Sequence, residues 1–150
     1  AVFGGQEKYS DRVIPWVTYT QPEIAHVGKY ERELKPGTFR TYTLGFAHND
    51  RCIAEGTREG FVRIHTGFDD DKILGATVVG DEAGEMISLY TLAMHAGIGA
   101  KKGSEIIAPY PTRSEMLKYT CNQFNIMTWG GWEGLKKSHT PIAEAHLRSE

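Results

Sequence analysis

The sequence predicts an α+β domain in which helices pack on one face of an antiparallel β-sheet. Strand-like segments fill the first half of the chain and helical patterns follow them, an order typical of this class. Two of the strands, at 61–66 and 73–80, are separated only by a short turn. A connection this short excludes a parallel crossover, so these two strands must form an antiparallel hairpin.

The strands are indicated by β-branched and aromatic residues and by alternation along the chain. Residues 13–20 are rich in such residues, and Pro15 near their start suits an edge strand. A short extended piece follows at 24–28, and residues 38–46 alternate between two faces. The nearly continuous apolar run at 73–80 predicts a central strand covered on both sides.

The first long helix is indicated by a change of hydrophobic period. Apolar residues recur every three or four positions from 83 to 94. We expect Asp81 to cap the start of this helix and Gly97 to end it. Residues 101–107 are consistent with a short helix, whereas residues 47–59 are polar and favour neither helix nor strand.

The last helix begins at a capping-box sequence. Thr112 is the expected cap, and Glu115 stands three residues later, where its carboxylate can accept from the backbone N–H of the cap. The positions that follow place Leu117, Cys121 and Phe124 on one apolar face.

Composition and charge limit the classes of function that the sequence allows. The chain has 150 residues, of which 40% are hydrophobic, enough for one compact core. The formal charge of −2 gives no electrostatic reason to expect nucleic acid or an anionic membrane as partner. Cys52 and Cys121 are far apart and form neither a disulfide framework nor a zinc pattern, so we expect a reducing, cytoplasmic setting.

Several common catalytic parts are missing from the sequence. It contains no Cys-x-x-Cys pair, nucleophile elbow or Gly-rich phosphate loop. Gly97-Ile98-Gly99 follows a helical segment rather than a strand, so a helix end is the better interpretation. Asp69-Asp70-Asp71 lies between two strands and indicates a solvated turn, not a calcium loop. We therefore expect no cofactor or metal in this chain and no activity in isolation.

Three blocks of sequence stand in an order and spacing that resembles a known family. The first is 14–28, the second combines 60–64 with 73–76 and 80–87, and the third is 109–115. Together they resemble the C-terminal dimerisation domain of the pyridine nucleotide-disulphide oxidoreductases. That family includes glutathione reductase, dihydrolipoamide dehydrogenase and mercuric reductase.

The resemblance implies the organisation of a larger flavoenzyme. Residues 13–126 would be the dimerisation domain, residues 1–12 an irregular leader from an upstream FAD domain, and residues 127–150 a C-terminal tail. FAD and NAD(P)H would be bound by the upstream domains, which with a second copy of the chain are the expected partners.

The resemblance also implies a site. The family's last block usually reads His-Pro-Thr-x-Ser-Glu, and its His and Glu serve the partner subunit's redox centre as an acid/base pair. Here Pro111, Thr112, Ser114 and Glu115 match, but the His position is Tyr110. Tyr110 and Glu115 are therefore the candidate catalytic residues, acting in trans in the full-length parent.

The Tyr substitution alters the expected chemistry. A phenol titrates near pH ~10 and cannot shuttle protons at neutral pH as an imidazole does. The change favours the mercuric-reductase-like branch, although the paired C-terminal cysteines of true mercuric reductases are absent.

Two alternatives stay open from the sequence. Glu115 has a purely structural explanation in the capping box with Thr112, beside the catalytic one. The whole chain has a second interpretation as a free-standing α+β binding module without a redox role.

Overall fold

The computed structural model describes residues 12–128. The predicted leader (1–12) and tail (127–150) thus lie almost entirely outside the described residues. The strands are β1 (Pro15–Thr18), β2 (Glu23–Gly28), β3 (Phe39–Gly45), β4 (Phe61–Gly67) and β5 (Ile73–Gly80). The helices are α1 (Asp50–Glu55), α2 (Ala83–His95), α3 (Ala100–Ser104) and α4 (Glu115–Thr128), with short 3-10 turns at Glu31–Glu33 and Phe46–His48.

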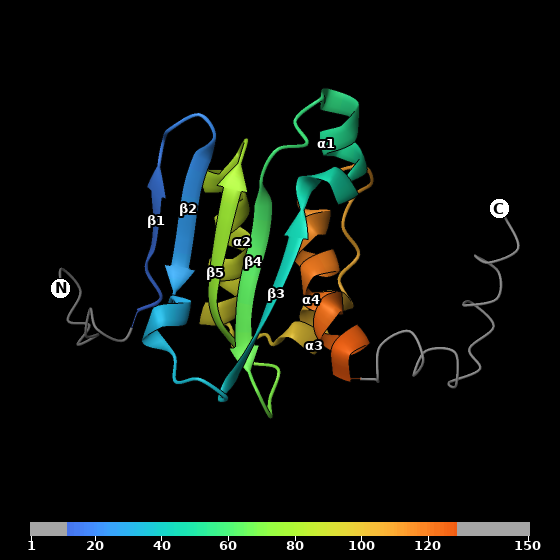
Figure 1. Ribbon diagram of the computed structural model, residues 1–150. Coiled ribbons are helices and arrows are strands. Elements are labelled where there is room, and N and C mark those ends of the chain that lie inside the picture. Colours follow the sequence, from blue (N-terminus) through green and yellow to red (C-terminus); the bar gives the residue numbers. More distant parts are fainter. Residues whose placement is uncertain (1–11, 129–150) are drawn as a thin grey trace, which may run out of the picture.

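The five strands form one sheet in the order β1-β2-β5-β4-β3, and each neighbouring pair is antiparallel. Helices α2 and α4 lie behind the sheet in the view of Figure 1, so the predicted α+β class with helices on one face is confirmed. The predicted hairpin is also confirmed: β4 pairs with β5 in a register that sets Val62 opposite Val78.

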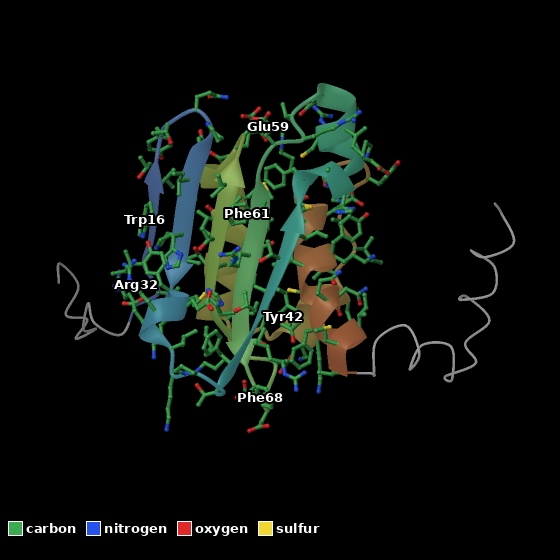
Figure 2. The ribbon with its side chains drawn as sticks, in the orientation of Figure 1. Trp16, Arg32, Tyr42, Glu59, Phe61 and Phe68 are labelled. Carbon is green, nitrogen blue, oxygen red and sulfur yellow. The ribbon has the colours of Figure 1, made fainter. Side chains whose placement is uncertain are left out.

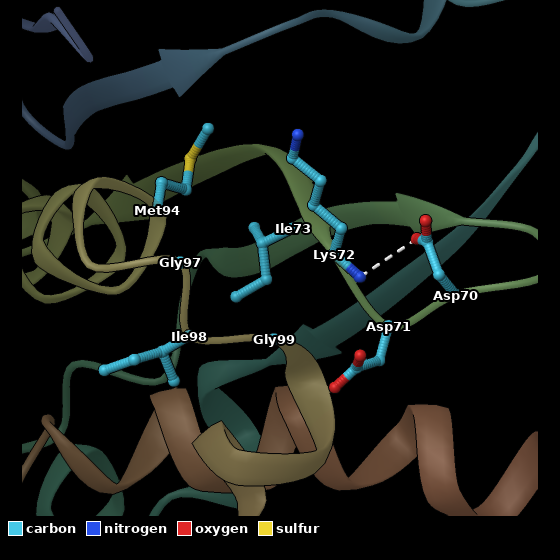
Figure 3. A pocket seen from close by; sticks show the side chains of 8 residues that line it. All are labelled: Asp70, Asp71, Lys72, Ile73, Met94, Gly97, Ile98 and Gly99. Carbon is cyan, nitrogen blue, oxygen red and sulfur yellow. Dashed lines mark hydrogen bonds between the residues drawn. The ribbon is translucent and has the colours of Figure 1, made fainter.

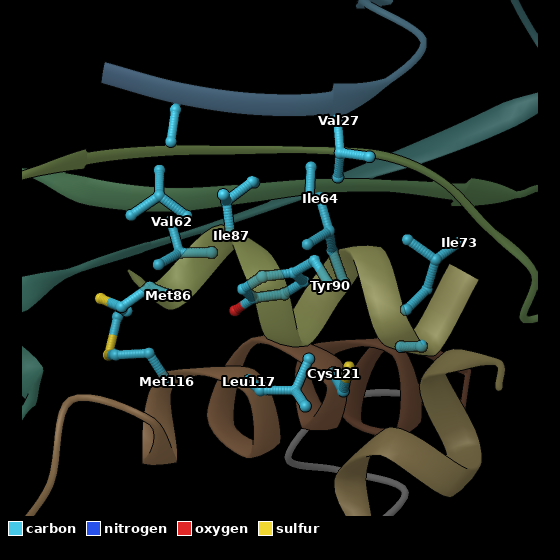
Figure 4. Close-up of a cluster of buried hydrophobic side chains, with 14 of the residues drawn as sticks. Val27, Val62, Ile64, Ile73, Met86, Ile87, Tyr90, Met116, Leu117 and Cys121 are labelled. Carbon is cyan, nitrogen blue, oxygen red and sulfur yellow. The ribbon is translucent and has the colours of Figure 1, made fainter. Parts of the chain in front are cut away.

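The core lies between the sheet and the two long helices. Alternate residues of β2, β4 and β5 point toward the helices, among them Val27, Val62 and Ile64, which have no exposed surface. They meet Tyr90 of α2 and Met116 of α4, which are equally buried (Figure 4). Each large apolar side chain buried in this way contributes roughly 1.5–3 kcal/mol to stability.

The opposite face of β5 is only partly covered, which corrects the prediction of a strand covered on both sides. On the face of β5 that points away from the helices, Thr77 and Val79 are half-buried, whereas Gly75 is buried. The segment after β2 crosses this face. There the N–H of Lys29 donates a hydrogen bond to the carbonyl of Leu74 at 2.9 Å. Toward the β1 edge, Trp16 remains 42% exposed (Figure 2).

The start of α2 differs from the prediction. Asp81 is not the cap, because its carboxylate accepts a hydrogen bond from the Gln21 side chain at 3.0 Å. Glu82 occupies the cap position in a left-handed conformation, with φ of 61° and no side-chain cap of its own. Glu23 of β2 instead accepts from the free N–H of Gly84 at 2.9 Å, so a strand caps the helix. The predicted end at Gly97 is confirmed, since its φ is 65°.

Residues 47–59, which the sequence left undecided, contain α1. Asn49 caps this helix by accepting from the N–H of Cys52 at 3.1 Å, and Gly56 ends it with φ of 72°. Six residues are too few for a hydrophobic period to show, so packing rather than pattern determines this helix.

Gly75 is where the crossing segment touches the sheet, and we expect Gly75→Ala to destabilise the fold. A Cβ at this position would lie 2.1 Å from the carbonyl oxygen of Lys29, which is backbone and cannot swing away. We expect the free energy of unfolding to fall by about 1–3 kcal/mol, measured by urea denaturation. Gly45→Ala is the matched control, because its Cβ would meet nothing closer than 3.7 Å. Equal effects of the two substitutions would contradict this explanation.

Candidate functional site

The candidate residues lie on the segment between α3 and α4, which we call the Tyr110 turn (residues 109–115). It runs beside α1 at one end of the sheet, opposite the end that holds the β4–β5 turn (Figure 1). Tyr110 is 70% exposed, whereas Glu115, the first residue of α4, is only 6% exposed. The two candidate side chains therefore sit in the same turn but in different environments.

Glu115 holds the turn together from the start of α4. One carboxylate oxygen accepts from the backbone N–H of Thr112 at 3.0 Å, and the other accepts from the hydroxyl of Tyr119 at 2.8 Å. The Thr112 hydroxyl does not return the bond, because the N–H of Glu115 donates to the carbonyl of Thr112 at 3.4 Å. The hydroxyl itself donates to the carbonyl of Pro109 at 2.6 Å. The predicted capping box is thus half formed, and both oxygens of Glu115 are occupied within the domain.

Tyr110 has a different partner from the one the family pattern implies. Its hydroxyl donates to Oδ2 of Asp50, at the start of α1, over 2.8 Å. This hydrogen bond raises the pKa of Tyr110 above its ordinary value, and the negative charges of Asp50 and Glu115 act in the same direction. The turn therefore brings together a Tyr110–Asp50 pair and a Glu115–Tyr119 pair, not a Tyr110–Glu115 pair.

Helix α1 and its cap residue contact the Tyr110 turn and hold it in place. Asn49 donates from its side chain to the carbonyl of Thr112 at 2.9 Å, while its oxygen caps α1. At the other end of α1, Glu55 forms an ion pair with Arg113 at 2.6 Å. Together with the Asp50 bond, these contacts fix the turn against both ends of one short helix.

Arg113 connects three elements through one guanidinium group. Besides Glu55, it pairs with Glu82 at the start of α2 over 3.1 Å and donates to the hydroxyl of Thr57 at 3.0 Å. Burial alone would lower the pKa of Arg113, but the charges of Glu82 and Glu55 outweigh it and raise the pKa. A hydrogen bond from Arg51, with the charge of Arg113, holds the pKa of Glu55 below its usual range. Arg113 and Glu55 are therefore both charged at neutral pH.

The two cysteines are buried and free. Burial raises the pKa of both thiols, that of Cys121 to about 12. Since only the thiolate is nucleophilic, neither cysteine is suited to redox or nucleophilic chemistry at neutral pH.

Sequence reasoning found the turn but missed Asn49, Asp50, Glu55 and Tyr119. Tyr119 could have been found, because it stands four residues after Glu115 and residues at this spacing meet on a helix. The residues of α1 are some sixty positions away from the turn in the sequence, and no local pattern connects them to it.

A hollow of about 230 Å³ lies at the other end of the sheet, between the β4–β5 turn and the α2–α3 connection (Figure 3). Asp70 and Asp71 line it, and they accept from the backbone N–H groups of Lys72 and Lys101. Two carboxylates disfavour the phosphates of a dinucleotide, so this hollow does not fit FAD or NAD(P)H. Across residues 12–128 we find no cluster of His, Cys, Asp and Glu that could hold a metal ion.

Comparison with known proteins agrees with this architecture. The family model for the "Pyridine nucleotide-disulphide oxidoreductase, dimerisation domain" matches residues 14–121. The chain belongs to this family. The match covers all five strands and extends into α4, and it contains the Tyr110 turn.

Relatives of this chain include dihydrolipoyl dehydrogenases. The mitochondrial enzyme of Caenorhabditis elegans is 37% identical over 120 residues, which are 78% of this chain and 24% of the relative. The enzyme of Trypanosoma brucei brucei is 40% identical over 111 residues, which are 73% of this chain and 23% of that protein. The chain thus spans about a quarter of the length of the curated relatives it matches.

Solved structures of flavoprotein reductases share the fold. LpdA from Mycobacterium tuberculosis aligns with a TM-score of 0.70 and 26% identity, over 74% of this chain and 25% of that chain. The HOCl-induced flavoprotein disulfide reductase RclA from Escherichia coli, in its Cu(II) complex, aligns with a TM-score of 0.74. The alignment covers 80% of this chain and 28% of the RclA chain. The sequences are only 22% identical, so the likeness is one of fold alone. None of the helices described in this chain has the length and apolar character needed to cross a membrane.

The bond from Tyr119 to Glu115 predicts a loss of stability in alkali. This bond raises the pKa of Tyr119 from 10.0 to about 12. A group whose pKa is raised by folding contributes stability that is complete below its unfolded pKa and is lost as the pH rises through the folded pKa. We therefore expect Tyr119 to account for a loss of about 1 kcal/mol between pH 10 and 12, after allowance for solvent screening.

Urea denaturation at stepped pH measures this loss as the difference between the chain and Tyr119→Phe. The variant should start about 1 kcal/mol less stable at neutral pH and converge with the parent chain in alkali. Tyr19→Phe is the control, because Tyr19 is 81% exposed. A difference that stays constant with pH would contradict the assigned role of Tyr119.

Proposed function

We propose that this domain pairs two subunits of an FAD- and NAD(P)H-dependent oxidoreductase and presents the Tyr110 turn to the active site of the partner subunit. The observation that carries the proposal is the contrast within the turn. Its backbone is fixed by Glu115, Asn49 and Arg113, yet Tyr110 at its tip is 70% exposed. An exposed aromatic residue on a rigid turn is a feature expected of a contact surface.

In this proposal FAD, held elsewhere in the assembly, supplies the electron-transfer chemistry. Tyr110 contributes a phenol that stays protonated at neutral pH, because its pKa lies above the ordinary value. It therefore orients or polarises a group of the partner and does not act as an obligatory base. Glu115 acts indirectly, since both its oxygens are engaged by Thr112 and Tyr119.

The proposal also includes an enzyme subtype and a cellular location. The mercuric-reductase-like subtype rests on Tyr110 alone, and the named relatives are dihydrolipoyl dehydrogenases. The cytoplasmic location rests on the unpaired cysteines, and one of those relatives is mitochondrial. Both assignments stay predictions.

We expect the 150-residue chain to form a homodimer. A two-fold interface joins the same patch of both copies, and a stable one typically buries more than ~2,000 Å². Sedimentation at micromolar concentration should give about twice the mass of the chain. A monomer across this concentration range would contradict pairing through this domain and would favour the free-standing binding module.

In a full-length flavoenzyme that carries this domain, we expect Tyr110→Phe to reduce turnover by less than about tenfold. The variant keeps the ring and removes only the hydroxyl, so it separates hydrogen bonding from packing. Tyr19→Phe is the control, because it removes the hydroxyl of another exposed tyrosine (81%, against 70% for Tyr110) outside the turn. A hundredfold loss in a folded Tyr110→Phe enzyme would instead identify Tyr110 as an acid/base group.

A further inference from the structure

Tyr110 and Asp50 come from different parts of the chain and meet at the exposed edge of the turn. The phenol donates to the carboxylate over 2.8 Å, and sixty positions of sequence separate the two residues. No other hydrogen bond of the Tyr110 hydroxyl is found within the described residues. The pair therefore accounts for the orientation of the exposed aromatic side chain of the turn.

The surrounding contacts hold the two backbones at this distance. Asn49, the neighbour of Asp50, donates to the carbonyl of Thr112, two residues after Tyr110. Glu55, one turn further along α1, pairs with Arg113. The backbones of Asp50 and Tyr110 are thus held by buried or half-buried contacts of their neighbours, while both residues are exposed.

A carboxylate accepts hydrogen bonds and donates none, so the phenol proton must point toward Asp50. The lone pairs of the oxygen of Tyr110, a residue that is 70% exposed, are then the part of the hydroxyl left to bind a further group. We propose that Asp50 is a positioning residue that presents Tyr110 to the partner subunit as a hydrogen-bond acceptor, so that the facing group is a donor. This inference rests on the proposed function and specifies the chemistry of its contact.

Association would strengthen the pair. In water an exposed hydrogen bond of this kind adds little, because solvent competes for both groups. A partner surface that covers Tyr110 and Asp50 removes this competition and lowers the local dielectric constant. The acidic groups near the phenol, Asp50 and Glu115, then favour a neutral or cationic donor over an anion.

The ionisation of Tyr110 in the 150-residue chain tests the inference. Ring-carbon NMR shifts of labelled tyrosine follow each phenol separately, and the resonance missing from Tyr110→Phe identifies Tyr110. We expect Tyr110 to ionise at a lower pH in Asp50→Asn than in the parent chain, because the carboxylate no longer opposes the phenolate. Asp50→Glu, which keeps the charge, should restore part of the shift.

Asp69→Asn is the matched control, because it removes the same charge from the β4–β5 turn at the opposite end of the sheet (Figure 1). Circular dichroism at each pH confirms that the variants stay folded. An unchanged Tyr110 ionisation in Asp50→Asn, or an equal shift in Asp69→Asn, would overturn the role of Asp50.

The titration needs neither flavin nor turnover, and sedimentation of the same samples reports subunit pairing. If the chain pairs but Asp50→Asn leaves Tyr110 unshifted, the inference fails and the proposed function stands. If Tyr110 shifts as expected but the chain is monomeric, the proposed function fails and the Tyr110–Asp50 pair stands.

Discussion

The Tyr110 turn depends on the guanidinium group of Arg113. This one cation joins the turn to Glu55 of α1 and to Glu82 at the start of α2, and only 9% of its side chain is exposed. A buried cation is costly unless it is paired, so both carboxylates must stay in place when the domain folds. Helices α1 and α2 are thereby joined to the turn that leads into α4.

The coupling separates the roles of the residues within the turn. Glu115 faces inward and serves the local structure, because its oxygens accept from Thr112 and Tyr119. Tyr110 is exposed, and within residues 12–128 the hydrogen bond that orients it is the one to Asp50. A dimerisation domain needs both properties, since a contact residue recognises a partner well only when its backbone is already in the bound geometry.

The sequence predicted what local patterns encode. Alternation and hydrophobic period predicted the strands and α2. The spacing of Thr112 and Glu115 predicted the start of α4 to within two residues, because the helix begins at Glu115 and not directly after Thr112. The pattern could not show that Glu23 would cap α2 in place of Asp81, because that bond joins elements from different parts of the chain. The same limit explains why α1 and Asp50 were missed: six residues carry no period, and their partners come sixty positions later.

Hydrogen exchange in Arg113→Met tests the central role of Arg113 most directly. We predict that the backbone N–H groups of Thr112 and Cys52, which bond to Glu115 and Asn49, lose protection together while those of β4 and β5 keep theirs. Arg51→Met is the control, because it removes another partner of Glu55 and leaves Arg113 intact. Unchanged protection of Thr112 and Cys52 in a folded Arg113→Met chain would contradict the account.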